Sequence, residues 1–215
     1  MIRRFFLPLA LMLAALSCSA QEEAPTFTAG KHYDVIADQV ARTADRNKIE
    51  VAEFFWYGCG HCYTFEPMLA AWKKTLAEDV AFRPIPAIWN PVMELHAKAY
   101  YTAEALGVFD SVHPALFEAM NAQRKRLGSV DEIAAIFVAQ GVAREDFDKA
   151  FNSFGVSSQV RQADAAAKSA GISGTPSMMV EGKYLLSGRK AGGQAEMLQI
   201  ADFLVAQERA ARAAQ

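Results

Sequence analysis

Hydrophobic residues change their spacing several times along the chain, and each change predicts a different element. Residues 50–57 and 80–85 are apolar at most positions, and residues 33–36 form a shorter run of the same kind. We expect three strands there, and the near-continuous apolar character of residues 50–57 is typical of a strand covered on both faces. Residues 59–76 have helical spacing, and Pro67 should kink that helix without ending it.

Helical spacing then continues without interruption from about residue 91 to residue 170. Asn90 and Pro91 form an N-cap and first-turn pair, and residues 129–132 read as a capping box. The basic residues 124–126 should end a helix that begins near Pro114, where the helix dipole favours positive charge. Five helices are expected, at residues 91–107, 114–126, 129–141, 143–151 and 157–170.

Strand spacing returns near the C-terminus. Residues 177–180 and 183–186 flank a turn at Glu181 and Gly182 and predict a hairpin, and residues 194–209 predict an amphipathic helix. The order of elements favours the α/β class, with one sheet domain that carries an inserted all-helical domain. We place the sheet domain at residues 21–88 and 172–215 and the helical insertion at residues 89–171.

The first twenty residues predict an export signal. Arg3 and Arg4 precede an apolar run over residues 5–16, which ends in the small residues 17–20. Cleavage after Ala20 would start the mature chain at Gln21. A second interpretation is a lipoprotein signal, in which an acylated Cys18 becomes the mature N-terminus. Both interpretations place the protein outside the cytoplasm.

Composition and charge exclude several classes of function. The chain has 215 residues, of which 52% are hydrophobic and 21% charged, as in a folded globular protein. Without the predicted leader it keeps 20 of its 22 basic side chains and all 24 acidic ones, a formal charge of −4. A nucleic-acid partner is therefore not expected.

Cys59 and Cys62 are the candidate chemistry of the mature chain. A pair with this spacing is compatible with a metal site, an iron–sulfur cluster, a structural bond or redox chemistry. A structural zinc or cluster needs four ligands, and the remaining histidines, His32, His96 and His113, lack metal-ligand spacing. We expect neither a metal nor another cofactor.

The position of the pair, where an apolar strand turns into a helix, favours redox chemistry. First-turn amides and the helix dipole should stabilise the thiolate of Cys59, which makes it a good leaving group and the oxidised pair an oxidant. The imidazole of His61 or its local backbone should donate to the same sulfur. Cys62 should be the more buried sulfur, and Gly60 leaves room for an approaching peptide.

Glu53 carries a carboxyl group inside a strand that we expect to be buried. It either faces outward or lies beneath the cysteine pair, where burial would raise its pKa and suit it to exchanging a proton with Cys62. Arg83 on the next strand is its candidate partner. Aromatic residues around the pair either form a rim that binds unfolded substrate or belong to the core: Trp56, Tyr57, Tyr63 and Phe65.

The segments EFFWYGCGHCY, residues 53–63, and GTPSMMVEGKY, residues 174–184, resemble the DsbA family of bacterial periplasmic disulfide oxidoreductases. The resemblance implies a thioredoxin-like fold interrupted by a helical domain. It also implies a periplasmic location, donation of the Cys59–Cys62 disulfide to newly exported polypeptides, and re-oxidation by a DsbB-type quinone-linked membrane partner. By the same resemblance, a cis bond before Pro176 would present the backbone of Thr175 to a substrate strand.

Other functions stay open at this point. Gly60 and Thr175 stand where the best-known members of that family have proline and valine, so a disulfide isomerase or reductase is the second hypothesis. Known bacterial isomerases carry an N-terminal dimerisation domain, for which the stretch before Tyr33 is too short, and we expect a monomer. A non-catalytic, chaperone-like module with a structural disulfide is the third hypothesis.

Overall fold

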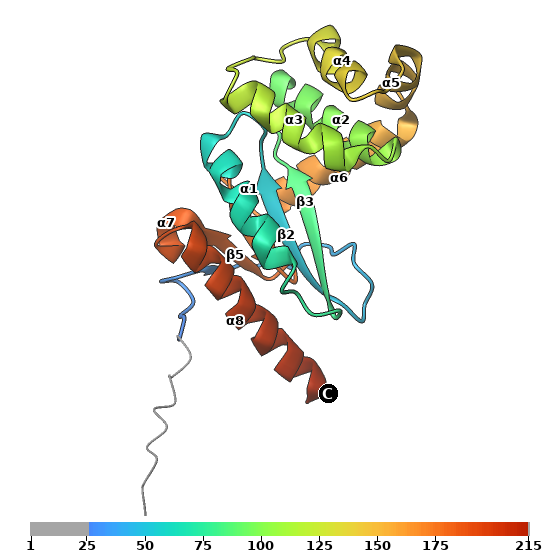
Figure 1. Ribbon diagram of the computed structural model, residues 1–215. Coiled ribbons are helices and arrows are strands. Elements are labelled where there is room, and N and C mark those ends of the chain that lie inside the picture. Colours follow the sequence, from blue (N-terminus) through green and yellow to red (C-terminus); the bar gives the residue numbers. More distant parts are fainter. Residues whose placement is uncertain (1–25, 215) are drawn as a thin grey trace, which may run out of the picture.

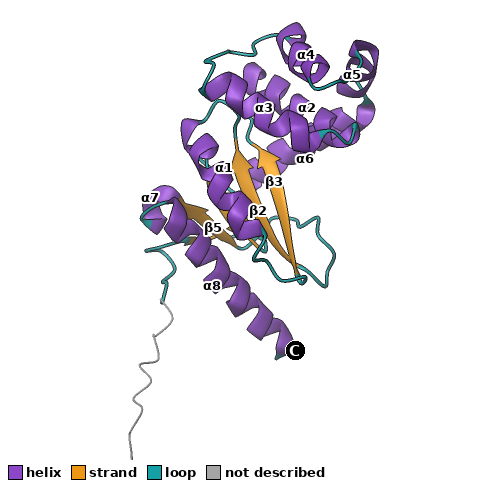
Figure 2. Ribbon diagram, viewed as in Figure 1, coloured by secondary structure: helices purple, strands orange, loops and turns teal. Residues whose placement is uncertain are grey.

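A computed structural model of the chain describes residues 26–214, which form one sheet and eight helices (Figures 1 and 2). The predicted leader and the alternative acylation site at Cys18 lie outside the described residues. Over residues 26–214, no helix combines the length and the apolar character that crossing a bilayer requires.

The sheet has five strands in the order β1-β5-β4-β2-β3. β2 and β3 run parallel, and the other neighbouring pairs are antiparallel. All seven residues of the central strand β2 are buried, as expected for a strand covered on both faces. The strands are β1 (Asp34–Val35), β2 (Ile49–Phe55), β3 (Val80–Pro86), β4 (Ser177–Val180) and β5 (Tyr184–Ser187).

Helices cover both faces of the sheet and one of its ends. α1 and α8 lie on one face of the sheet (Figure 1). The helices α2 to α6 follow β3 and precede β4 in the chain, and they lie mostly at one end of the sheet. The helices are α1 (Gly60–Lys73), α2 (Pro91–Ala105), α3 (Phe109–Asn121), α4 (Val130–Ala139), α5 (Arg144–Phe151), α6 (Phe154–Ser169), α7 (Gly188–Ala191) and α8 (Gln194–Ala213). This is the predicted α/β class with an all-helical block inserted into the sheet.

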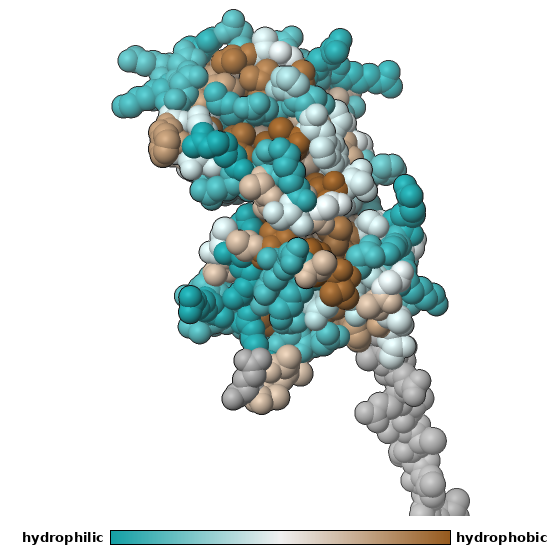
Figure 3. All heavy atoms as spheres, turned by 180° about the vertical axis from the view of Figure 1, so that it is seen from behind, coloured by the Kyte–Doolittle hydropathy of each residue, from teal (hydrophilic) through white to brown (hydrophobic). Residues whose placement is uncertain are grey.

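Because side chains alternate along β2, its residues pack in two separate hydrophobic cores, one on each face of the sheet. Val51 packs with residues of α1 and α8, whereas Ala52 and Phe54 pack with residues of the helical block. Seen from behind, hydrophobic residues reach the surface where the helical block meets the sheet (Figure 3). The helical block therefore shares a core with the sheet.

The expected start and end of the second inserted helix are wrong. α3 begins at Phe109, five residues before Pro114, and ends at Asn121, so the basic residues 124–126 lie in the following loop. Arg124 has a φ of 56°, which no helix accommodates. Val112 of α3 is buried in the core, and this burial offsets the backbone hydrogen bond that Pro114 cannot donate. The single-turn helix α7 was not expected.

The expected capping box and hairpin are present. Ser129 and Glu132 cap α4 reciprocally. Glu181 and Gly182 both have positive φ, at 55° and 66°, in the turn between β4 and β5. A side chain at Gly182 would overlap the carbonyl of Val40, so this turn requires glycine both for its conformation and for the close approach of the chain.

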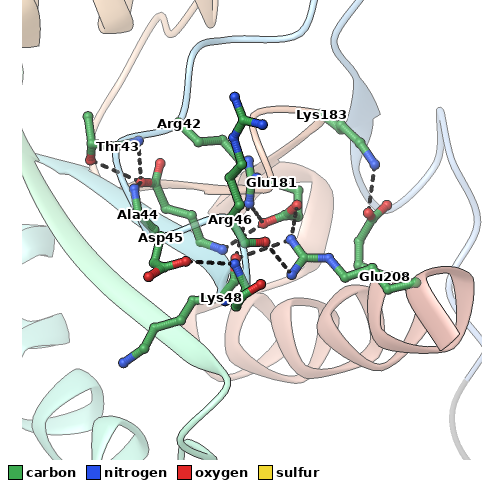
Figure 4. A network of polar contacts seen from close by, with 12 residues as sticks. Arg42, Thr43, Ala44, Asp45, Arg46, Lys48, Glu181, Lys183 and Glu208 are labelled. Atoms are coloured by element: carbon green, nitrogen blue, oxygen red, sulfur yellow. Dashed lines mark hydrogen bonds and ion pairs between the residues drawn. The ribbon is translucent and has the colours of Figure 1, made fainter.

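A buried polar network ties the segment before β2 to this turn and to α8 (Figure 4). The carboxylate of Glu181 is 4% exposed and accepts hydrogen bonds from Arg42 at 2.8 Å, from Arg212 at 2.7 Å and from the amide of Glu50 at 2.7 Å. Two guanidinium groups on one buried carboxylate compensate for its desolvation. Glu181 thus joins three segments that are distant in sequence.

Candidate active site

Cys59 lies where β2 gives way to α1, at the N-terminal end of the helix. Its side chain is the N-cap of α1, since the sulfur accepts the amide of Cys62 at 3.3 Å. The first turn of α1 contains no acidic residue. The partial positive charge of the helix end therefore acts on this sulfur without a carboxylate in the same turn.

Donors around Cys59 favour its thiolate. Hydrogen bonds from the thiol of Cys62, from the side chain of Thr175 and from the amides of Cys62 and His61 lower the pKa of Cys59 from an ordinary 9.0 to about 5, against the opposing effect of burial. At neutral pH the free thiol is then mostly ionised. A sulfur that is stable as an anion leaves readily from a disulfide.

Cys62 has the opposite character. It is 0% exposed, and burial together with its hydrogen bond to the Cys59 sulfur raises its pKa well above the ordinary value. Both thiols are free in this structure, which therefore has the dithiol form of the pair. In that form the pair has one ionised, accessible sulfur and one protonated, buried sulfur.

Pro176 lies beside this pair, at the start of β4. The Thr175–Pro176 peptide bond is cis, and the Thr175 carbonyl oxygen lies 3.3 Å from the Cys59 sulfur. Cys59 and Pro176 are distant in sequence. They lie close together because β4 runs antiparallel to β2, with Ser177 opposite Phe54. The backbone of Thr175 thus borders the accessible sulfur.

Glu53 lies in the sheet with a buried carboxyl group. It is 1% exposed, and its Oε1 has no hydrogen-bond partner among the described residues. Burial, with smaller contributions from the charges of Glu66 and Cys59, raises its pKa well above the ordinary value. Of the two interpretations of this residue, the buried one agrees with the structure.

The expected pairing of Glu53 with Arg83 is wrong. Arg83 contacts Glu50 instead, at 3.1 Å. Arg83 stands opposite Ala52 in the parallel ladder, and Glu53 stands opposite Pro84. Because side chains alternate along a strand, Arg83 shares the face of Ala52 and Glu50, whereas Glu53 points to the other face.

His61 and Gly60 are both exposed at the start of α1. The backbone amide of His61 is among the donors that lower the pKa of Cys59, and its carbonyl accepts the side-chain amide of Gln194 at 2.6 Å. No hydrogen bond joins its imidazole to the sulfur in the described part of the chain. Of the two donors expected at this position, the backbone is the one in contact.

Tyr57 is not part of an exposed rim. It is 1% exposed, and its hydroxyl forms a 2.8 Å hydrogen bond with Nδ1 of His113. The direct substrate contact expected of Tyr57 is therefore wrong, because the ring is enclosed by Phe55 and Phe117. Phe65 is also buried, and the two other aromatic residues, Trp56 and Tyr63, are half-exposed.

The helical block holds the active-site segment through residues that sequence patterns did not single out. Nε1 of Trp56 donates to Nδ1 of His96 at 2.9 Å, and the side-chain amide of Asn121 donates to the carbonyl of Tyr57 at 2.8 Å. Burial lowers the pKa of His96, which keeps its ring neutral and able to accept from Trp56. A side chain at Gly58 would overlap the Trp56 ring.

Comparison with known proteins gives a consistent result. A family model described as a DSBA-like thioredoxin domain matches residues 74–204. The chain is 41% identical over 201 residues to the thiol:disulfide interchange protein DsbA of Azotobacter vinelandii, a match that covers 93% of this chain and 94% of that protein. It is 38% identical over 210 residues to the protein of the same name from Pseudomonas aeruginosa, which covers 98% of this chain and 99% of that one.

Solved structures agree with these relatives. The crystal structure of Pseudomonas aeruginosa DsbA superposes with a TM-score of 0.82 at 39% identity and covers 86% of this chain and 96% of that one. The oxidoreductase DsbA from Xylella fastidiosa gives a TM-score of 0.78 at 35% identity, with 87% and 99% covered. The predicted thioredoxin-like fold with a helical insertion is confirmed.

Proposed function

Because this chain belongs to the DsbA family and is a thiol:disulfide oxidoreductase, a dithiol oxidase, we propose that its Cys59–Cys62 disulfide is donated to reduced polypeptides newly exported to the periplasm. The ionised state of Cys59 carries this proposal. Hydrogen bonds from the Cys62 thiol and the other donors lower the pKa of that sulfur to about 5. The reduced pair is thereby stabilised, so the oxidised pair gives up its bond readily.

The reaction is an exchange in two steps. A substrate thiolate attacks the Cys59 sulfur of the oxidised pair, the bond to Cys62 breaks, and a mixed disulfide forms. A second substrate thiolate then attacks the substrate's own sulfur, and Cys59 leaves as a thiolate. The substrate loses two electrons and two protons, of which Cys62 keeps one proton as a thiol and solvent takes the other.

Glu53 is the proposed proton donor to Cys62 as that sulfur leaves. Burial raises the pKa of its carboxyl group, which therefore stays protonated to a higher pH than the carboxyl group of an ordinary glutamate. The charge of Glu53 also raises the pKa of Cys62, so the two groups are close enough to influence one another. An acid with a buried, unpartnered oxygen is suited to exchanging a proton without a fixed counterion.

The substrate is proposed to bind as an extended segment along Thr175 and Pro176. The Thr175 carbonyl oxygen lies 3.3 Å from the Cys59 sulfur, so a strand that pairs with this backbone would bring its cysteine to the same sulfur. Gly60 offers space on the opposite side, since the nearest atom to an added side chain would be 3.9 Å away. His61 borders the same approach.

Further proposals concern the division of the chain, the protein that re-oxidises the pair, and the state in which this protein works. Residues 1–20 are the proposed leader, residues 89–171 the proposed helical insertion domain, and residues 21–88 with 172–215 the proposed thioredoxin-like domain. A DsbB-type membrane protein coupled to quinone is the proposed re-oxidant, because each substrate leaves the pair reduced. The protein is proposed to work as a monomer, either free in the periplasm or anchored through Cys18.

The direct test is the oxidation of a reduced model protein by the oxidised enzyme. Cys59→Ser should abolish oxidation, because Cys62 alone cannot form the disulfide that the substrate attacks. Cys62→Ser, given a disulfide-bonded substrate, should accumulate mixed disulfides visible as covalent adducts on a non-reducing gel, because the Cys59 thiolate attacks the substrate bond, one substrate sulfur leaves as a thiolate, and no Cys62 thiol remains to release the adduct. Full activity in the Cys59 variant would contradict the assignment.

Equilibration with glutathione separates the three hypotheses. A pair that oxidises the glutathione buffer supports the oxidase. A poise far below that buffer would indicate a reductase, and a bond that resists reduction altogether would indicate a structural disulfide.

A further inference from the structure

A cavity of about 620 Å³ opens beside the cysteine pair, between the start of β4 and the segment from β5 to α8. A volume in this range is typical of a site that holds a ligand or a short peptide segment. Its wall contains three residues of the active-site rim: His61, Thr175 and Pro176. The Thr175 carbonyl oxygen lies 3.3 Å from the Cys59 sulfur, so one residue of the cavity wall borders the reactive atom.

The position of this wall is fixed by contacts to the active-site helix. The side-chain amide of Gln194, which also lines the cavity, donates to the carbonyl of His61 at 2.6 Å. The start of α8 is therefore held against the start of α1. A segment that pairs with the backbone of Thr175 would therefore lie beside this cavity.

The charged side chains around the cavity differ in whether they have a partner. Its lining includes one acidic residue, Asp34, and two basic residues, Arg189 and Lys190. Lys190 forms an ion pair with Asp34, which offsets both charges. Arg189 is exposed and forms no ion pair with any residue in the range 26–214. A further carboxylate, that of Glu196, lies beside Gly193, another residue of the cavity wall.

We propose that Arg189 is a specificity-determining residue that favours substrate segments with an acidic side chain close to the reacting cysteine. The proposal rests on the function proposed above and adds a preference among substrates. Arg189 contacts the substrate and takes no part in the exchange of electrons. Its guanidinium presents several donors in a planar fork, which suits a carboxylate better than a neutral amide.

The expected size of the effect follows from the exposure of Arg189. Ion pairs at exposed positions are weak and are screened by salt. We therefore expect kcat/KM for an aspartate-containing substrate to exceed that for its asparagine counterpart by about threefold at low salt. Asp34→Asn should widen this ratio, because it frees the charge of Lys190 for the same ligand.

The test uses peptides with two cysteines in which the residues flanking the first cysteine are Asp, Asn or Lys. Their oxidation by the full-length enzyme is followed at low salt and at about 0.5 M salt, where the Debye length falls to a few Å. Arg189→Gln should bring the Asp and Asn peptides to the same rate, and Arg189→Glu should favour the Lys peptide. Arg161→Gln is the matched control, since it removes one exposed arginine on α6, outside the cavity wall, and should keep the preference.

The outcomes distinguish this inference from the function on which it rests. Failure of the unmodified enzyme to oxidise the neutral Asn peptide would overturn the proposed function. Oxidation of the Asp and Asn peptides at equal rates, or an equal loss of preference in the Arg161 control, would overturn the role of Arg189 alone. A preference that disappears in Arg189→Gln, persists in Arg161→Gln and falls with salt is the expected result.

Discussion

The backbone amide of Cys62 donates to the sulfur of Cys59 over 3.3 Å, so one cysteine of the pair caps the helix that carries the other. This relationship gives the two sulfurs different chemistry. Donors around Cys59 lower its pKa, whereas burial raises that of Cys62. The thiol of Cys62 contributes most to the lowered pKa of Cys59, and the side chain of Thr175 and the amides of Cys62 and His61 contribute less.

His61 provides the first test, because its backbone and its side chain can be separated. His61→Pro removes the amide that donates to Cys59 at a first-turn position where proline is tolerated. It should raise the pKa of Cys59 by about one unit, since a hydrogen bond to a charged group contributes roughly 1.5–3 kcal/mol. His61→Ala keeps the amide and should change the pKa less. Thiolate absorbance measures both, and a larger shift in the alanine variant would assign the effect to the imidazole.

The raised pKa of Glu53 predicts that the free energy of unfolding depends on pH. Its pKa is raised in the folded state, so its contribution to stability is complete below the unfolded pKa, near 4.5, and is lost as the pH rises toward the folded pKa. Glu53→Gln removes this loss and should stabilise the reduced protein by roughly 1 kcal/mol at pH 8, but little at pH 4. Denaturant unfolding at both pH values measures the difference. An equal effect at the two pH values would contradict a buried, titrating carboxyl group.

The buried hydrogen bond between Tyr57 and His113 joins the active-site segment to the helical block, and we expect it to contribute to stability. Tyr57→Phe removes the hydroxyl that is paired with Nδ1 of His113 in a buried position and should lower the free energy of unfolding by about 1–2 kcal/mol. Tyr63→Phe is the matched control, since it breaks an exposed hydrogen bond to Glu118 and should cost less than about 0.5 kcal/mol. Equal losses in the two variants would show that the His113 contact has no special weight.

Glu181 predicts the cost of breaking the buried network of Figure 4. Glu181→Gln leaves Arg42 and Arg212 without their carboxylate and should destabilise the fold by about 3 kcal/mol. Asp131→Asn removes an exposed ion pair with Arg144 and should cost less than about 1 kcal/mol. Thermal unfolding compares the two. A loss at Glu181 no larger than the loss at Asp131 would contradict the structural weight of this network.

Local patterns predicted most elements of the fold. The continuous apolar run of β2 and the capping box of Ser129 depend on neighbours in sequence, so their positions follow from the residues themselves. α3 was misplaced because Pro114 is a strong local signal, yet the burial of Val112 against the rest of the block decides where that helix begins. A single turn such as α7 has too few residues for a period to show.

The cysteine pair was predicted correctly in position, and its surroundings only in part. Whether Glu53 faces Arg83 depends on the register and the face of two strands, which hydrophobic spacing does not specify. His113 carried no signal of its own, since its partner Tyr57 is 56 residues away in the chain. The aromatic character of Tyr57 fits a binding rim as well as a core, and its burial is decided by helices from the inserted block.

The titration of Cys59 in the reduced protein tests the central claim most directly. Ultraviolet absorbance of the thiolate, followed from acid to alkaline pH, reports this group alone because the pKa of Cys62 is raised well above the ordinary range. We predict a single transition with a midpoint at about 5. A midpoint near 9.0, the ordinary value for cysteine, would contradict the account.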